Sequence, residues 1–107
     1  MQLDVKPFRA DCTDKEAAFK VLEEASEARE AWQELDSTLA MKRHLGEVNS
    51  AKTLTGSWVD AASRHLADEI ADCITACANL AERYGLDMQA ALDRVERKNR
   101  ERGRYDG

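Results

Sequence analysis

The sequence predicts an all-α fold, an antiparallel bundle of three to five helices, and three observations support this prediction. The 107-residue chain is rich in helix formers such as Ala, Glu, Leu, Arg and Lys, with one proline and five glycines. Aromatic and β-branched residues, which favour strands, are few. Apolar residues recur every three or four positions in two long segments, as on amphipathic helices. We expect one domain spanning residues 1–107.

The first helix is expected to begin at a capping box after an irregular segment, residues 1–12. In Thr13-Asp-Lys-Glu16, the Thr hydroxyl and the Glu carboxylate can accept hydrogen bonds from free N–H groups of the first turn. An apolar face then carries the helix to about Leu35. Four glutamates point away from this face and are predicted to be solvated: Glu16, Glu23, Glu30 and Glu34.

Residues 36–57 are the least regular part and are interpreted as a probable insertion or connecting segment, with a short helix over 39–45 and a turn from Gly46. Thr55 or Ser57 would cap the next helix, and Gly85 would end it. Asp87 would cap a last helix that runs into a basic tail. The long middle helix has an apolar stripe that we expect to face the core: Leu66, Ile70, Cys73, Ile74, Cys77, Leu80 and Tyr84.

Charge and hydropathy exclude several classes of function. A net charge of −5 argues against general binding of a nucleic-acid polymer. No apolar run reaches the roughly 20 residues that span a membrane, and no signal-peptide core precedes the first helix, so a cytoplasmic location is expected. The three cysteines are expected to be reduced and buried. A zinc site of Cys73 and Cys77 with His65 or His44 does not have the spacing of common zinc motifs.

Two acidic residues, Glu69 and Asp72, lie beside the apolar stripe, where side chains pack against a neighbouring helix. Buried carboxylates need basic partners or a cation. In an antiparallel pair of helices, Glu24 and Glu27 of the first helix can face them. Four converging carboxylates favour a hard divalent cation, Mg²⁺ with Mn²⁺ as an alternative. Magnesium also binds the phosphates of nucleoside triphosphates.

Four stretches resemble the all-α nucleoside triphosphate pyrophosphatases, the MazG-like superfamily. Two are the acidic pairs, Glu23-Glu24-Ala-Ser-Glu27 and Glu69-Ile-Ala-Asp72. Two follow them: Leu80-Ala-Glu-Arg-Tyr-Gly-Leu-Asp87 and Val95-Glu-Arg-Lys-Asn-Arg-Glu-Arg102. The 41 residues between Glu27 and Glu69 exceed the usual separation, so residues 36–57 could add a lid, a nucleotide contact or an oligomer interface.

The resemblance implies Mg²⁺-dependent hydrolysis of a nucleoside triphosphate between its α and β phosphates, which yields a monophosphate and pyrophosphate. It implies metal ligation by Glu24, Glu27, Glu69 and Asp72, with Glu23 binding a second metal or positioning water. Lys98 and Asn99 match residues that contact phosphate or sugar, and Arg102 could add charge. It also implies a homodimer or homotetramer, because relatives commonly complete their sites by assembly.

Two further residues and two rival functions complete the interpretation. His65 could contact phosphate or a metal-bound water, although a hydrogen bond to Glu69 is the simpler expectation, and Asn79 could read a base edge. One rival is a non-catalytic helical interaction module whose acidic face binds a partner. The other, a carboxylate-bridged redox metal bundle, is disfavoured because the chain has no Glu-x-x-His pair.

Overall fold

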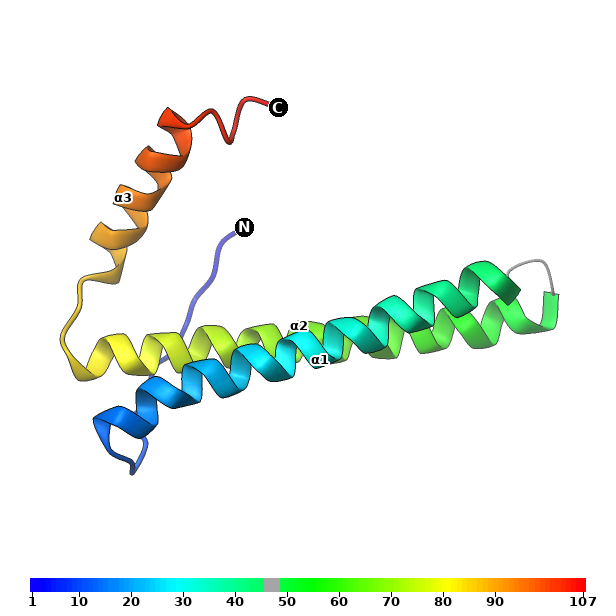
Figure 1. The fold of residues 1–107 in the computed structure, drawn as a ribbon, viewed down its shortest axis with the longest axis horizontal. Coiled ribbons are helices and arrows are strands. Elements are labelled where there is room, and N and C mark those ends of the chain that lie inside the picture. The colour runs from blue at the N-terminus through cyan, green and yellow to red at the C-terminus, as the bar shows by residue number, and fades with distance from the viewer. Residues whose placement is uncertain (46–48) are drawn as a thin grey trace.

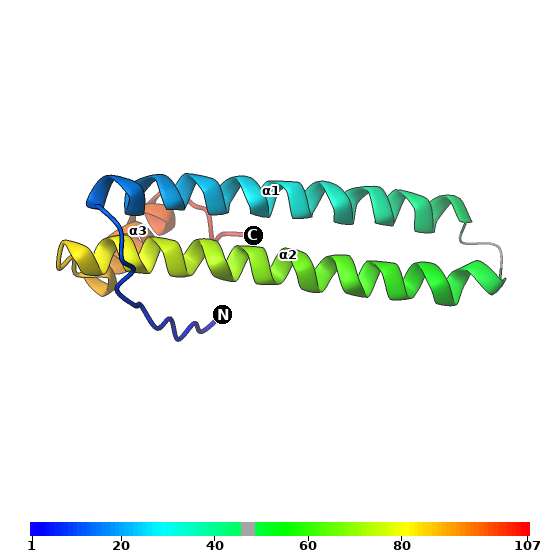
Figure 2. The same ribbon diagram turned by 90° about the horizontal axis from the view of Figure 1, so that it is seen from below.

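The computed structural model describes residues 1–45 and 49–107, with side chains outside 46–55. These residues form three α-helices and no strand, which confirms the all-α prediction: α1 (Asp14–Leu45), α2 (Asn49–Arg83) and α3 (Met88–Glu101). Helices α1 and α2 lie side by side as a long antiparallel hairpin, whereas α3 leads away from it (Figures 1 and 2). No described helix is both long enough and apolar enough to cross a membrane.

The caps predicted at Thr13, Gly85 and Asp87 are confirmed, whereas Thr55 and Ser57 lie inside α2 and do not cap it. The Thr13 N–H donates to Glu16 Oε1 at 3.2 Å, and the Glu16 N–H donates to Thr13 Oγ1 at 3.1 Å, as in a capping box. Asp87 caps α3 by accepting from the Ala90 N–H at 3.0 Å. Gly85 follows α2 with φ at +60°, a conformation that side chains with a Cβ rarely adopt. Local chemistry therefore sets these helix ends.

The expected boundaries around residues 36–57 were wrong. Helix α1 continues past Leu35 to Leu45, and α2 begins at Asn49, so most of this segment lengthens the two arms of the hairpin. No glycine or proline interrupts α1 before Gly46, and helix formers fill positions 39–45. Gly56 lies inside α2, where it costs about 1 kcal/mol relative to alanine without ending the helix. The turn expected from Gly46 falls largely outside the described residues.

The two arms meet along a seam of residues spaced seven apart. On α1 the buried seam positions are Ala17, Glu24 and Ala31, and on α2 the matching positions are Ala62, Glu69 and Ala76. Running antiparallel, the two heptad series set Ala17 level with Ala76 and Glu24 level with Glu69. Alanine allows close approach of the two backbones. The seam is therefore narrow, and it carries a glutamate at its middle on each helix.

The predicted core-facing stripe is only partly buried in this chain: Leu66, Cys73, Ile74 and Leu80 are half-buried, whereas Ile70, Cys77 and Tyr84 are exposed. Residues one, four and eight positions after Glu24 or Glu69 lie on one side of the hairpin, because equal offsets on antiparallel helices point to the same side. Trp32 and Ile70 lie there, 52% and 45% exposed, and Cys77 and Tyr84 are exposed too. Where side chains are described, the buried hydrophobic residues are all alanines: Ala17, Ala31, Ala62, Ala76 and Ala81.

We expect Ala31→Leu to destabilise the hairpin by about 1–3 kcal/mol, because Ala31 is only 1% exposed and extra methylenes in the seam push the helices apart. Urea unfolding followed by far-ultraviolet circular dichroism, at one fixed protein concentration, measures this loss. The matched control, Ala40→Leu, adds the same group at an exposed position of α1. Equal unfolding midpoints for the two variants would contradict the seam.

Candidate metal centre

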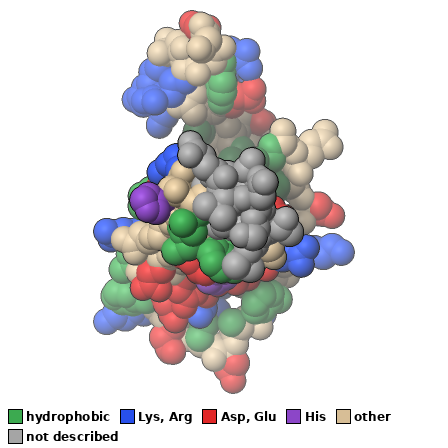
Figure 3. Space-filling model, turned by 90° about the vertical axis from the view of Figure 1, so that its right-hand side faces the viewer, with side chains coloured by type: hydrophobic (Ala, Val, Ile, Leu, Met, Phe, Trp, Pro, Cys, Tyr) green, Lys and Arg blue, Asp and Glu red, His purple; other side chains and the backbone are tan. Residues whose placement is uncertain are grey.

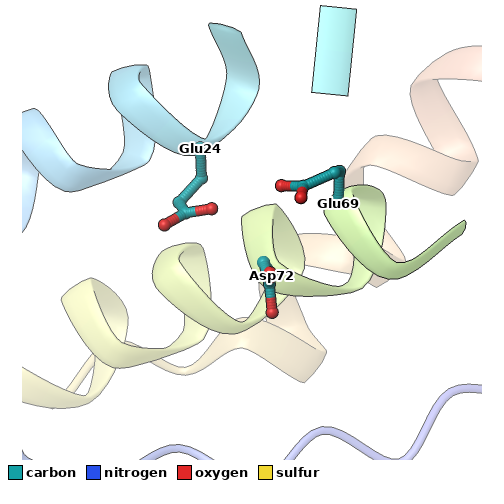
Figure 4. A group of neighbouring side chains, drawn as sticks. All are labelled: Glu24, Glu69 and Asp72. Atoms are coloured by element: carbon teal, nitrogen blue, oxygen red, sulfur yellow. The ribbon is translucent and has the colours of Figure 1, made fainter. Parts of the chain in front are cut away.

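Three carboxylates from the two arms converge at the middle of the seam. Glu24 extends from α1 toward α2, Glu69 extends back from α2, and Asp72 lies one turn further along α2 (Figure 4). One oxygen from each carboxylate lies within 4.8 Å of the others. Oxygen ligands from several carboxylates are what Mg²⁺, Mn²⁺ and Ca²⁺ prefer. The antiparallel pairing therefore assembles a set of donors suited to a hard divalent cation.

Burial leaves this group short of positive charge. The Glu24 residue is only 8% exposed, and its Oε1 accepts a salt bridge from Lys20 Nζ at 3.0 Å. His65 Nε2 lies 3.2 Å from Glu69 Oε1. The second oxygen of each glutamate, Oε2, is buried and accepts no hydrogen bond from any group that the structure describes. A buried acceptor left unpaired costs about 1–3 kcal/mol, and more when it is charged. These two oxygens are the strongest structural indication that the three carboxylates form a candidate cation site.

Glu27 borders the group without belonging to it. Hydrogen bonding with Glu24 raises the pKa of the Glu27 carboxyl above its ordinary value, and repulsion from the charges of Glu24 and Glu69 raises it further. The fourth acid predicted from sequence therefore lies close enough to feel the others. Its oxygens do not join the three that come within 4.8 Å of one another.

The structure places predicted Glu23 at the edge of the carboxylate group and keeps the predicted phosphate contacts on α3 away from it. Glu23 is exposed and pairs with Lys20 at 3.4 Å, at the rim of the group. Lys98, Asn99 and Arg102 belong to α3 and the residue that ends it, and α3 points away from the hairpin (Figure 1). In Figure 3, which looks along the hairpin from its tip, Lys and Arg side chains gather on α3 at the top.

His65 links two acids of different helices. Its Nε2 faces Glu69, as expected, and its Nδ1 lies 3.1 Å from Glu34 Oε2. The hydrogen bond to Glu34 raises the pKa of His65, and the bond to Glu69 adds to this. Sequence reasoning placed Glu34 on the solvated surface, because nothing local pairs residues 31 positions apart. It also missed Lys20, although its spacing of four from Glu24 is typical of helical ion pairs.

The cysteines and Asn79 take other roles. All three thiols are free, and burial raises the pKa of Cys73, but Cys77 is exposed, so the expectation of three buried thiols was wrong. Within the described residues, the group that could hold a metal contains neither cysteine nor histidine, in contrast to the zinc alternative. Asn79 accepts a hydrogen bond from the Phe8 N–H at 2.7 Å, a contact with the N-terminal segment that no sequence pattern indicated.

Comparison of the chain with models of known protein families, with curated proteins and with solved structures found no match. The fold and the carboxylate group therefore define the class on their own. The chain is an all-helical hairpin with a candidate cation centre between its arms.

We expect Glu34→Gln to lower the pKa of His65, because it removes the negative charge from the hydrogen-bond acceptor that contributes most to the raised value. In the parent, the folded state binds the His65 proton more tightly than the unfolded state. This stabilisation is complete below the ordinary pKa and is lost as the pH rises through the raised one. A ¹H–¹³C NMR titration of the imidazole measures the shift. His44 is the internal control, and an unchanged His65 midpoint would contradict the Glu34 contact.

Proposed function

We propose that this protein is a Mg²⁺-dependent nucleoside triphosphate pyrophosphohydrolase that cleaves between the α and β phosphates. The observation that supports it most directly is the pair of buried, unpartnered oxygens, Glu24 Oε2 and Glu69 Oε2, within a group of three carboxylates. A buried oxygen that accepts no hydrogen bond is unfavourable, and a divalent cation is a partner that these oxygens fit. The two acidic pairs of the resemblance contain these same residues.

In this proposal, Glu24, Glu69 and Asp72 hold the cation, and Glu27 becomes a fourth ligand. When bound, Mg²⁺ would neutralise phosphate charge, polarise the phosphorus under attack and lower the pKa of a bound water. Entry of positive charge would also remove the repulsion that raises the Glu27 pKa. Glu23, at the exposed rim, would position the attacking water, and His65 would keep Glu69 oriented.

A second copy of the chain would cover the exposed apolar side of the hairpin. Buried alanines alone supply too little apolar burial to stabilise a domain of about this size. The side that carries Trp32 and Ile70 is large and apolar, and pairing two hairpins would turn it into the core of a four-helix bundle. This arrangement is the homodimer expected from the resemblance, and a homotetramer would pair two such units.

The same assembly gives a role to α3. Lys98, Asn99 and Arg102 do not approach the carboxylates of their own chain, because α3 departs from the end of the hairpin (Figure 1). In a dimer, α3 of one copy would bring its cations to the phosphates bound at the other copy's carboxylates. One chain then supplies the metal ligands, and the other supplies the phosphate contacts.

We expect Mg²⁺ to stabilise the parent by about 2–3 kcal/mol at a concentration a hundredfold above its Kd, because only the folded protein forms the site. The double variant Glu69→Gln with Asp72→Asn should lose this response and should release no pyrophosphate from a panel of nucleoside triphosphates. Its unfolding midpoint in chelator should not fall, since the substitutions also relieve repulsion. Thermal unfolding and a pyrophosphate assay measure both effects.

The matched control removes the same charges elsewhere on α2, at two exposed acids, Asp60→Asn with Glu82→Gln. This control should keep both the Mg²⁺ response and the activity. Sodium chloride at equal ionic strength separates specific binding from screening. A parent that responds equally to both salts and hydrolyses no nucleotide would support the non-catalytic interaction module instead.

We expect activity to be restored when two inactive proteins are mixed. Glu69→Gln/Asp72→Asn lacks the metal ligands, and Lys98→Ala lacks a phosphate contact. After subunit exchange, mixed dimers contain one site with all of its parts, so about a quarter of parental activity should return. Light scattering first establishes the dimer. A monomeric mass, or no recovery after demonstrated exchange, would rule out a site shared between copies.

A further inference from the structure

A cavity of about 660 Å³ opens beside the carboxylate group, within the size range of small-molecule sites. Glu24 and Asp72 line one end of it, and Asn79 lines the other. Asn79 lies seven residues after Asp72 on α2, which is about 10 Å along the helix. The walls between them are mostly apolar, with two aromatic side chains, Phe8 and Phe19. A ligand that bridges both ends needs a part that binds a cation held by the carboxylates and a flat apolar part.

The N-terminal segment, residues 1–12, forms one wall of this cavity because α2 anchors it. Arg83 is the main anchor: its guanidinium donates to the carbonyl oxygens of Ala10 and Cys12 and pairs with Asp14 at 2.9 Å. This network holds the segment across α2 without any helix of its own. Phe8 is thereby kept at the cavity while its ring stays 61% exposed. An exposed aromatic ring on an anchored segment is a surface for stacking.

The side-chain amide of Asn79 has two N–H donors in addition to the oxygen that contacts the N-terminal segment. Its Oδ1 accepts the Phe8 N–H at 2.7 Å, which fixes the orientation of the amide because a backbone N–H needs an oxygen acceptor. The Nδ2 group then carries two N–H donors beside the cavity. Phe19, on the other aromatic wall, has Lys15 Nζ 5.8 Å from its ring centre, so Phe8 is the freer of the two rings.

We propose that this cavity binds the nucleobase of the substrate, which stacks on Phe8 and receives a hydrogen bond from the Asn79 amide at an acceptor on its edge. The inference rests on the proposed function, because the carboxylate group at the other end would hold the phosphates through the cation. The sugar spans the two turns of α2 between Asp72 and Asn79. The N-terminal segment is then a substrate-binding element and not merely an anchored tail.

The test compares nucleoside 5′-monophosphates with ribose 5-phosphate, which has the same sugar and phosphate but no base. In Mg²⁺ buffer, at least one monophosphate should bind about tenfold more tightly than ribose 5-phosphate, and the Phe8 amide and Asn79 side-chain resonances should shift. Phe8→Ala should reduce this ratio to near one. Asn79→Asp keeps the acceptor for the Phe8 N–H but removes both donors, so it should lower the ratio about three- to tenfold. Gln33→Glu adds the same charge at an exposed site outside the cavity and should leave the ratio unchanged.

The outcomes separate this inference from the proposed function. If every monophosphate binds like ribose 5-phosphate, or if Phe8→Ala and Asn79→Asp leave the ratio unchanged, the base does not enter the cavity, whatever the pyrophosphate assay shows. If the ratio responds as expected but the parent releases no pyrophosphate, the cavity binds nucleotides and the hydrolytic function is wrong. Retained Mg²⁺ stabilisation of both variants shows that the metal centre remains folded.

Discussion

The placement of two glutamates in a seam otherwise made of alanine is the constraint on which the rest of the structure depends. Glu24 and Glu69 occupy positions where an apolar residue would stabilise the helix pair more. Lys20 and His65 each neutralise one oxygen, and the remaining two are left buried and unpaired. A hairpin that accepts this destabilisation needs stability from other sources. In the proposed function, a bound cation would be one such source, and packing against a second copy would be another.

The two sides of the hairpin differ in chemical character: one is suited to binding a cation and the other to packing against a second copy. Positions four before and three after the seam glutamates carry ionisable residues such as Lys20, His65 and Asp72, and of these Lys20 and Asp72 line the cavity. Positions one and eight after the same glutamates carry apolar residues, including Trp32 and Ile70. Equal offsets from the two glutamates point to the same side of an antiparallel pair. Ionisable side chains therefore gather on one side of the hairpin and apolar side chains on the other. Ligand binding and assembly therefore need not compete for the same surface.

The parts that sequence predicted well are those governed by local chemistry. The Thr13 box and the Asp87 cap involve residues three apart, and spacing alone identifies them. The meeting of Glu24 with Glu69 and Asp72 followed from antiparallel pairing. Part of the stripe, including Ile70 and Tyr84, is exposed, because periodicity finds an apolar face without saying how much of it the same chain covers. Long-range contacts such as the hydrogen bond between Phe8 and Asn79 produce no periodic pattern in the sequence. The cavity wall formed by the N-terminal segment therefore could not be predicted from sequence.

The lengthening of α1 and α2 through residues 36–57 bears on the assembly more than on the cation centre. The carboxylate group lies about three turns inward from Leu35, so extending the arms does not alter its geometry. Longer arms do lengthen the apolar side. It reaches Leu39, which lies about two turns after Trp32 on the same side of α1. A longer interface gives more burial for each copy. In the proposed dimer, the extra turns would add apolar burial that offsets the cost of the carboxylates in the seam.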